Sequence, residues 1–376
     1  MKEVYVVADN IISPLGLSTS ENFSNLLKGK SGIQEHSNDK LSGNVFFASL
    51  LNNEFDFLAK KQTIHTKFEL LLIKSIETAL VSTNVLLSDK KTILIISTTK
   101  GNVSLIENEN IDPSLQKRIA LYTSANMVAQ HFSCSNKPII ISNACISGLA
   151  AILMGKRLIQ SGMYDNAVVV GADEVSKFVL SGFESFQAIS PLPCKPFDEE
   201  RKGINLGEGA GSMVLSSNKK YAGNIKVAGG SISNDANHIS GPSRTGEELC
   251  QAIKLAMQQA ALCANDIDLV SAHGTATIYN DEMETLAFDL ANLLPAPVIS
   301  LKGYFGHTLG AAGIIESIIS IHSLQQNVVL PSRGFTKLGV SKPLNVSNKL
   351  QNITLNNCIK TASGFGGCNA ALIYSK

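Results

Sequence analysis

Cys145, His273 and His307 each lie close to the end of a predicted strand. Together they supply one thiol and two imidazoles. Cys145 follows an apolar run ending at Ile141 and precedes a helical pattern rich in small residues. His273 follows the apolar run ending at Val270, and His307 lies in the segment LKGYFGHTLGAAG. A helix amino terminus favours a thiolate, and its free N–H groups can hold an oxyanion. A cysteine with two imidazoles therefore suits nucleophilic and acid–base chemistry on a carbonyl group.

Each of these features also has a simpler explanation. Most buried cysteines are inert packing residues, and a single histidine is more often structural than catalytic. Metal binding is disfavoured because no H-x-x-x-H or carboxylate spacing accompanies the histidines. The turn SGFGGCNA, with Phe365 as its one bulky residue, fits either close approach of a ligand or a tight β-turn. The remaining histidines stand in ordinary contexts and are given no role: His36, His65, His131, His238 and His322.

Short apolar runs that alternate with helical patterns must position these residues. Continuous apolar runs predict strands buried on both faces at residues 4–7, 92–96, 138–141 and 167–171. Helical periodicity predicts helices at residues 67–82, 148–160, 247–261 and 312–325. This alternation is typical of α/β layering with a mainly parallel sheet.

The second part of the chain repeats the first in the same order. VYVVADNIIS near residue 4 matches IKVAGGSISN from 225, and KTILIISTTKG from 91 matches DIDLVSAHGTA from 266. KPIIISNACISGLAAI from 137 matches APVISLKGYFGHTLGAAGI from 296, with Cys145 opposite His307 and Gly148 opposite Gly310. We predict two α/β halves, residues 1–218 with the nucleophilic cysteine and 223–376 with the two histidines, which meet at a central cleft.

Composition excludes several functional classes. The 376 residues are 44% hydrophobic and only 17% charged, which predicts a large core or subunit interface. A net charge of +1 argues against nucleic acid and anionic membranes as partners. Seven cysteines without paired spacing, and no signal peptide, indicate reduced thiols and a cytoplasmic location. The apolar stretch 139–155 is short for a membrane span and contains polar residues, so we predict core elements there.

Several motifs resemble those of the β-ketoacyl synthases of the thiolase superfamily. They are NACISG from Asn143, HGTAT from His273 with Asn280, Asp281 and Glu284 beyond it, the segment from Lys302 to Gly313, and GFGG from Gly364. PFDEERKGINLGEGAG from Pro196 and ADNIISPLG near the amino terminus are also similar to that family's segments. The resemblance runs from residue 4 to residue 374 in one order.

This resemblance implies a fold, a reaction and partners. The fold is α/β: a duplicated five-layer αβαβα thiolase fold with two mixed five-stranded sheets, in a dimer. The reaction is a decarboxylating Claisen condensation between malonyl-acyl carrier protein and an enzyme-bound acyl thioester. The partner is an acyl carrier protein, whose phosphopantetheine is its own prosthetic group, so the resemblance implies no cofactor or metal bound by the enzyme.

The resemblance also implies a role for each matching residue. Cys145 would be the acyl nucleophile, and His273 and His307 would assist decarboxylation and stabilise the enolate. Lys302 and Glu284 would order the histidine side of the site. The backbone N–H groups of Cys145 and Phe365 would form the oxyanion hole, and Phe365 would also act as a gate. The substrate-binding residues would be Thr275, Thr277, Gly364, Gly366 and Lys100.

Departures from the family pattern narrow this interpretation. The segment STTKGN from Ser97 replaces a glycine-rich turn that ordinarily lines the acyl pocket near the dimer interface, and Ala276 replaces a commoner glycine. Lys100 would be a poor floor for a long saturated chain, which favours an aryl polyene or flexirubin-type pathway over housekeeping fatty-acid elongation. The dimer would be a homodimer or a heterodimer with a chain-length-factor-like paralogue. A non-catalytic chain-length factor is the alternative, but such subunits lose the nucleophile. A degradative thiolase and the Cys-His-Asn initiating synthase fit the motifs less well.

Overall fold

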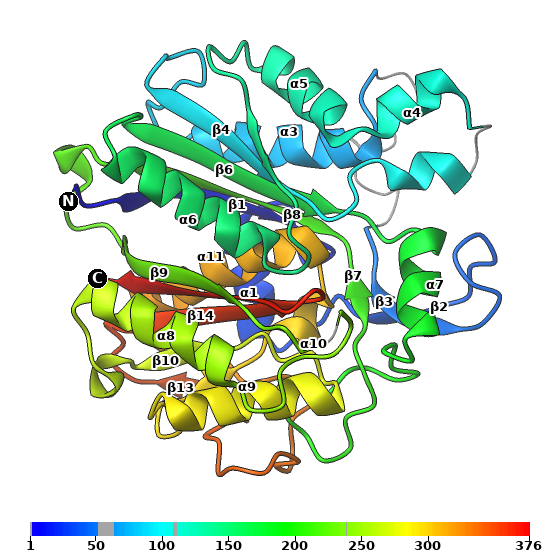
Figure 1. The fold of residues 1–376 in the computed structure, drawn as a ribbon, viewed down its shortest axis with the longest axis vertical. Helices are drawn as coiled ribbons and strands as arrows, with labels where there is room; N and C mark the ends of the chain where they lie inside the picture. Colours follow the sequence, from blue (N-terminus) through cyan, green and yellow to red (C-terminus); the bar gives the residue numbers. More distant parts are fainter. Residues whose placement is uncertain (1, 52–63, 108–110, 238) are drawn as a thin grey trace.

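Ten strands form one mixed sheet whose two halves lie on either side of a central layer of helices (Figure 1). The computed structural model describes residues 2–51, 64–107, 111–237 and 239–376. The strand order is β11-β10-β14-β15-β9-β1-β8-β6-β4-β5. The strands from the first part of the chain are β1 (Tyr5–Ile12), β4 (Thr92–Ser97), β5 (Ile139–Ile141), β6 (Asn166–Asp173) and β8 (Gly209–Ser216). Those from the second are β9 (Lys226–Asn234), β10 (Leu269–Ser271), β11 (Val298–Ile299), β14 (Asn357–Gly364) and β15 (Cys368–Ser375).

The strand order confirms the internal duplication. Outward from the middle, the first half runs β1-β8-β6-β4-β5 and the second runs β9-β15-β14-β10-β11, so each half uses its strands in the same sequence. The resemblance implied two separate five-stranded sheets, and this prediction needs one correction. The two sets are joined into a single ladder because Tyr5 of β1 pairs with Lys226 of β9. Both halves are mixed: β4 pairs in parallel with β5 and β6, while β6 and β8 are antiparallel.

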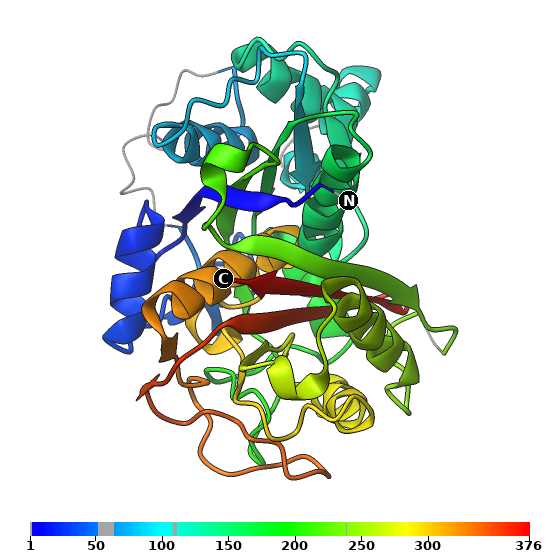
Figure 2. The ribbon, with the colours of Figure 1, turned by 90° about the vertical axis from the view of Figure 1, so that its left-hand side faces the viewer.

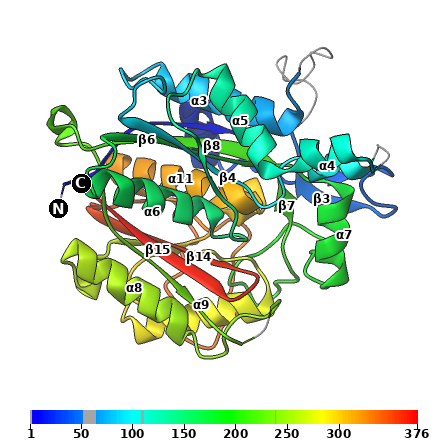
Figure 3. The same cartoon turned by 45° about the horizontal axis from the view of Figure 1, so that its top comes forward.

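Helices cover the sheet in the predicted five layers (Figure 1). One outer layer contains α3 (Lys67–Leu80) and α5 (Leu121–His131), and the other contains α8 (Glu247–Ala260) and α9 (Ile278–Leu290). Between the two halves of the sheet lie α6 (Ser147–Gln160) and α11 (Ala312–Gln326). Two further views show these two helices enclosed by strands on both sides (Figures 2 and 3). The central layer therefore carries the segments that follow Cys145 and His307.

The two central helices approach closely because glycines lie where they cross. A Cβ atom added to Gly148 of α6 would lie 2.8 Å from the backbone nitrogen of Ile314, and one added to Gly313 of α11 would lie 2.6 Å from that of Leu149. Real Cβ atoms do not approach other atoms so closely, so a side chain at either position would push the helices apart. The small residues after Cys145 and His307 thus set the distance between the two turns.

The predicted strands and helices are all present, with boundaries shifted by a few residues. The largest difference is β1, which continues to Ile12, five residues beyond the predicted end. The apolar stretch 139–155 divides into β5 and the first part of α6, as expected for core elements. Among the described residues, no helix is long and apolar enough to cross a membrane. The division at residues 218–223 stays a prediction.

Further elements surround this framework. The short strands form small separate pairings: β2 (Gln34–His36), β3 (Phe46–Ser49), β7 (Leu206–Gly207), β12 (Val328–Val329) and β13 (Gln351–Asn352). The remaining α-helices within the described residues are α1 (Thr19–Leu27), α4 (Pro113–Ile119), α7 (Lys177–Ser185) and α10 (Lys302–Phe305). Single 3₁₀ turns include η4 (Leu309–Ala311), which leads from His307 into α11.

Candidate active site

A tight turn between β5 and α6 presents Cys145. Ala144 has a left-handed φ of 43°, which is strained for a residue with a side chain. Ser147 stabilises this turn: its hydroxyl accepts the N–H of Asn143 at 2.8 Å and donates to the carbonyl of Ala144 at 2.6 Å. Cys145 is buried, and α6 begins two residues later. The sequence prediction of a cysteine at a strand-to-helix turn is confirmed.

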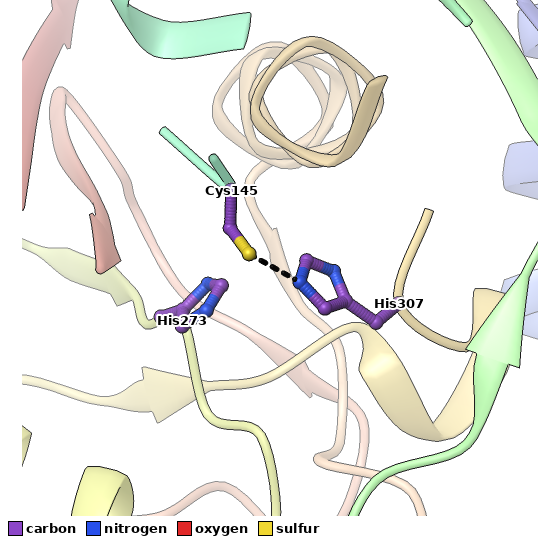
Figure 4. A group of neighbouring side chains, drawn as sticks. All are labelled: Cys145, His273 and His307. Carbon is purple, nitrogen blue, oxygen red and sulfur yellow. Dashed lines mark hydrogen bonds between the residues drawn. The ribbon is translucent and has the colours of Figure 1, made fainter. Parts of the chain in front are cut away.

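His307 contacts the thiol directly. Its Nε2 lies 2.9 Å from Sγ of Cys145 (Figure 4). The backbone N–H of Leu309 donates to the other ring nitrogen, Nδ1, at 3.3 Å. A neutral imidazole carries one proton, so this bond places that proton on Nε2. His307 therefore directs an N–H donor toward the sulfur atom and toward any oxyanion formed beside it.

His273 completes the group from the loop that follows β10. Its ring centroid lies 5.2 Å from that of His307, with the rings nearly perpendicular at 83°. One nitrogen of each ring and the sulfur of Cys145 all lie within 4.8 Å of one another. Figure 4 shows both rings directed at the sulfur from different parts of the chain. The pairing of a helix-start thiol with two imidazoles, expected from the repeat, is confirmed.

Burial determines the protonation of these three groups. It raises the pKa of the Cys145 thiol to about 12, and nearby Lys302 only partly opposes this. Burial also lowers the pKa of both His273 and His307 well below the usual value, and Lys302 lowers each further. The resting site therefore holds a neutral thiol and two neutral imidazoles. The helix amino terminus favours the thiolate, but burial has the larger effect and keeps the resting thiol protonated. The thiolate forms when substrate and the His307 N–H group stabilise the negative charge.

A buried ionic cluster lies behind the histidines. Glu316 of α11 accepts Nζ of Lys302 at 2.7 Å and Nζ of Lys360 at 2.6 Å. Glu284 of α9 accepts the backbone N–H groups of His273 at 2.7 Å and of Gly274 at 2.6 Å. These ionic side chains are all almost wholly buried. Glu284 thus fixes the backbone at His273. This contact agrees with the prediction that Glu284 orders the histidine side of the site.

The active-site pocket opens from the thiol past a set of aromatic rings. Its volume is about 540 Å³, and it reaches Cys145 and both histidines. The ring of Phe365, at the β14–β15 turn, lies 5.6 Å from that of Phe183 and 5.4 Å from that of Phe186. Phe365 is 39% exposed, so its ring is not fixed by close packing on all sides. The position fits the predicted gate, while the gating motion itself stays a prediction.

The pocket brings some predicted residues together and leaves others aside. Thr275, Thr277 and Gly364 line it. Gly366 lies at the turn but is not part of the lining, and its N–H bonds the carbonyl of Ile239 at 2.7 Å. Lys302 and Glu284 lie behind the histidines, as expected of residues that do not touch substrate. The oxyanion-hole assignment to Cys145 and Phe365 stays a prediction.

Lys100 lies on a well-ordered turn but outside the pocket. Its side chain is exposed in the isolated chain. Beside it, the buried carboxylate of Asp173 accepts the hydroxyl of Thr98 at 2.6 Å, the N–H of Thr99 at 2.9 Å and the N–H of Gly310 at 2.7 Å. Asp173 therefore ties this turn to the segment after His307. Within a single chain Lys100 does not line the active-site pocket, so its role in substrate binding stays a prediction.

Sequence reasoning missed four residues of the site. Phe183 and Phe186 lie on and just after α7, and Glu316 and Lys360 form the ionic cluster. A charge within an otherwise apolar helix or strand was the available signal for Glu316 and Lys360. The aromatic pair had no comparable signal, because exposed phenylalanines at a helix end are common in any sequence. The expectation that no metal is bound here stays a prediction.

Comparison with known proteins agrees with this geometry. The amino-terminal domain of β-ketoacyl synthases matches residues 1–221, and the carboxy-terminal domain matches residues 214–336. A 3-oxoacyl-[acyl-carrier-protein] synthase 2 from Vibrio cholerae is 30% identical over 419 residues, which cover 100% of this chain and 99% of that protein. The structure of the ishigamide ketosynthase/chain length factor has a TM-score of 0.91 at 25% identity, covering 100% of this chain and 99% of the other.

The chain belongs to the β-ketoacyl synthase family. It has the thiolase-like fold of the ketosynthases and a Cys-His-His site, and it is an acyltransferase of the 3-oxoacyl-[acyl-carrier-protein] synthase class. Its activity is the condensing reaction of the β-ketoacyl synthases. A ketosynthase from Xenorhabdus doucetiae in complex with its chain length factor matches the fold at a TM-score of 0.85 and 24% identity, over 100% of this chain and 98% of that chain.

Proposed function

We propose that the chain condenses malonyl-acyl carrier protein with an acyl group held on Cys145, and that it does so in a specialised polyene or polyketide-like pathway. The observation that carries this proposal is the 2.9 Å approach of His307 Nε2 to the sulfur, with His273 beside both. A reactive thiol and two neutral N–H donors in one buried site suit thioester exchange followed by enolate chemistry.

The first step loads the enzyme. The sulfur of Cys145 attacks the thioester of an acyl-carrier protein, a carbon–sulfur bond forms, and the carrier's phosphopantetheine thiol leaves with the proton. The backbone N–H groups of Cys145 and Phe365 would hold the transient oxyanion. Gly364 places these segments side by side, because a Cβ atom there would lie 3.0 Å from the Cys145 nitrogen.

The second step forms the new carbon–carbon bond. The bond between the malonyl methylene carbon and its carboxylate breaks, and carbon dioxide leaves without the electron pair. That pair makes an enolate of the carrier thioester, and two imidazole N–H groups would donate to its oxygen. The enolate carbon then attacks the acyl group on Cys145, the carbon–sulfur bond to Cys145 breaks, and the departing thiolate takes up one proton from solvent to restore the resting thiol. No cofactor is needed beyond the phosphopantetheine brought by the carrier.

The pairing proposal rests on the edge of the sheet. β5 is the terminal strand on the side of the first half, and its three isoleucines are only half-buried in the single chain. An apolar edge strand with free backbone groups is normally covered by another chain. Lys100 lies on the turn after neighbouring β4, so an identical subunit would bring a second Lys100 to the same boundary. We therefore favour a heterodimer with a chain-length-factor-like paralogue over a homodimer.

Acylation of the purified protein tests the reaction and the chain length together. We expect a panel of acyl-carrier thioesters to add one acyl group at Cys145, and mass spectrometry of the intact protein would give the preferred chain. Cys145→Ala should remain folded and take up no acyl group. Stoichiometric acylation of that variant at another cysteine would contradict the nucleophile assignment.

Co-expression tests the pairing separately. Native mass spectrometry of the chain produced with the product of a neighbouring ketosynthase-like gene should show a one-to-one complex. A stable homodimer that elongates acyl chains without help would contradict the heterodimer and would favour ordinary fatty-acid elongation. A non-catalytic chain-length factor, the other alternative, is disfavoured because the thiol and both imidazoles are present and in contact.

A further inference from the structure

Lys360 is a wholly buried cation beside the active site that the reaction scheme does not use. It lies in the middle of β14, and its Nζ is 2.6 Å from a carboxylate oxygen of Glu316. The same ammonium group donates to the carbonyl of Ala272 at 2.9 Å and to that of Ser271 at 3.2 Å. Three acceptors satisfy all three of its N–H bonds.

Charge balance with Glu316 does not require this lysine. Lys302 already pairs with Glu316 at 2.7 Å, and the other buried carboxylate whose charge acts on Lys360 is Glu284, so the two lysines and the two carboxylates of this cluster balance in charge. Burying a cation is costly, and an apolar side chain of similar size is often equally stable in such a place. The two carboxylates account for a positive charge at position 360, whereas the bonds of Lys360 to two backbone carbonyl groups connect it to the chain just before His273.

The duplication provides an internal comparison for this position. In the first half, Asn166 of β6 pairs with Ser216, and in the second Asn357 of β14 pairs with Ser375. Counting three residues onward, Val169 and Lys360 occupy the same place in the two ladders. Val169 is wholly buried in an apolar cluster, so this place in the fold accepts an ordinary core residue.

The charge of Lys360 acts on the histidines. Ser271 and Ala272, whose carbonyl groups it bonds, directly precede His273. After burial and Lys302, Lys360 is a further cause of the lowered pKa of both His273 and His307. Among the described residues, the other titratable or charged groups around the site include Lys100, Cys145, Asp173, Arg201, Lys202, Asp235, Tyr279, Asp281, Glu284, Lys302, Glu316 and Cys368.

We propose that Lys360 is a positioning residue that holds the backbone before His273 and keeps both imidazoles uncharged while the enolate forms. A protonated imidazole would give its proton to the enolate or to the thiolate, whereas a neutral N–H group only stabilises the negative charge. This inference rests on the condensing activity of the proposed function and adds the residue that sets its lower pH limit.

Two replacements of Lys360 test the proposal. Lys360→Met removes the charge and the hydrogen bonds, and Lys360→Gln removes the charge but keeps an N–H donor. Without this cation the imidazole pKa rises, and activity is lost as pH falls through that pKa. We therefore expect the acid limb of kcat/KM for decarboxylation of malonyl-carrier protein to move to higher pH by roughly one unit in both variants.

A matched control separates charge from stability. Val169→Ala removes buried apolar contacts at the equivalent position, and it should lower the melting temperature without moving the acid limb. If Lys360→Gln restored the wild-type profile while Lys360→Met did not, Lys360 would be only a hydrogen-bond anchor. Acid limbs at the wild-type position in both variants would overturn the proposal.

A measurement on the wild-type enzyme remains decisive if the variants do not fold. ¹⁵N-histidine NMR should show His273 and His307 neutral at pH 6, and a protonated ring there would overturn the proposal. Where Lys360→Gln folds, both ring pKa values should rise by roughly one unit. This titration needs no substrate, so failure of the proposed pathway or pairing would leave it unaffected.

Discussion

The two halves of the molecule use one strand-turn-helix plan for different chemistry. In the first half, β6 packs Val169 against α6 at Gly155, where a Cβ atom would lie 3.3 Å from the valine side chain. In the second half, β14 places Lys360 against Glu316 of α11 with an ion pair of 2.6 Å. The first half thus presents a thiol from an apolar surrounding, and the second presents imidazoles from an ionic one.

This difference follows what each reactive group requires. A neutral resting thiol is stable in an apolar surrounding, and burial is the main cause of its raised pKa, with Cys368 and Asp173 raising it further. Imidazoles that must donate without being protonated benefit from nearby positive charge, which the second half supplies through Lys302 and Lys360. The comparison indicates that the shared strand-turn-helix plan positions the reactive groups, while side chains on a strand and a helix of the second half set their electrostatics.

The largest expected effect comes from removing either donor. His273→Ala and His307→Ala should each lower malonyl decarboxylation by about 10²–10⁴-fold, while the first half still transfers some acyl groups to Cys145. Combining the two should cost less than the product of the single effects, because both groups act on one enolate. Steady-state kinetics and intact mass spectrometry measure the two steps separately.

His322→Ala is the matched control for these variants. His322 also lies on the second half, in α11, where Nε2 is 3.2 Å from the carboxylate of Asp9 and outside the active-site pocket. Its loss should leave decarboxylation within about twofold of wild type, since this partly buried pair does not contact the active-site pocket. Near-normal condensation by either active-site variant would reassign that histidine as structural.

The next largest effect should come from placing a lysine at position 169, the equivalent place in the first half. Val169→Lys places an ammonium group in an apolar cluster without a carboxylate, which should lower the free energy of unfolding by about 3–5 kcal/mol. Val169→Ala should cost less, about 1–3 kcal/mol, since it removes only buried methyl groups. Urea denaturation measures both. If the lysine variant were as stable as the alanine variant, this position would not distinguish the halves as we argue.

The sequence predicted the framework well because the relevant signals are local. The apolar runs around residues 92–96 and 167–171 became β4 and β6, and the repeated segments predicted the matching strand order. The three reactive groups were found because each lies in a short motif. Glu316 and Lys360 were missed because their meaning depends on a contact between residues 44 positions apart. The structure of a single chain likewise gives no evidence on where Lys100 lies in a dimer.

The crossing of the two central helices should respond symmetrically in the two halves. Gly148→Ala and Gly313→Ala each place a methyl group within 2.8 Å of the other helix's backbone, so each should lower the free energy of unfolding by about 1–3 kcal/mol. Gly182→Ala in α7 is the control, because a Cβ atom there meets nothing within 4 Å and alanine favours a helix. Equal stability of all three variants would mean that the crossing adapts freely.

The smallest effect concerns Ala276, which follows His273 in the second half. Its φ of 60° is left-handed, and the residue is wholly buried, with its N–H bonded to Asp281 at 3.2 Å and its carbonyl to the Gly203 N–H at 3.0 Å. Ala276→Gly should relieve about 1 kcal/mol of backbone strain but increase the entropy of the unfolded chain by nearly as much. We therefore expect the free energy of unfolding to rise by less than about 1 kcal/mol, with unchanged decarboxylation.

The strain in the two halves can be compared with a second variant, Ala144→Gly, because Ala144 has a matching left-handed φ of 43° at the cysteine turn. Thermal denaturation of both variants makes this comparison. A loss of stability at position 276 alone would show that the buried methyl group contributes more than the strain costs.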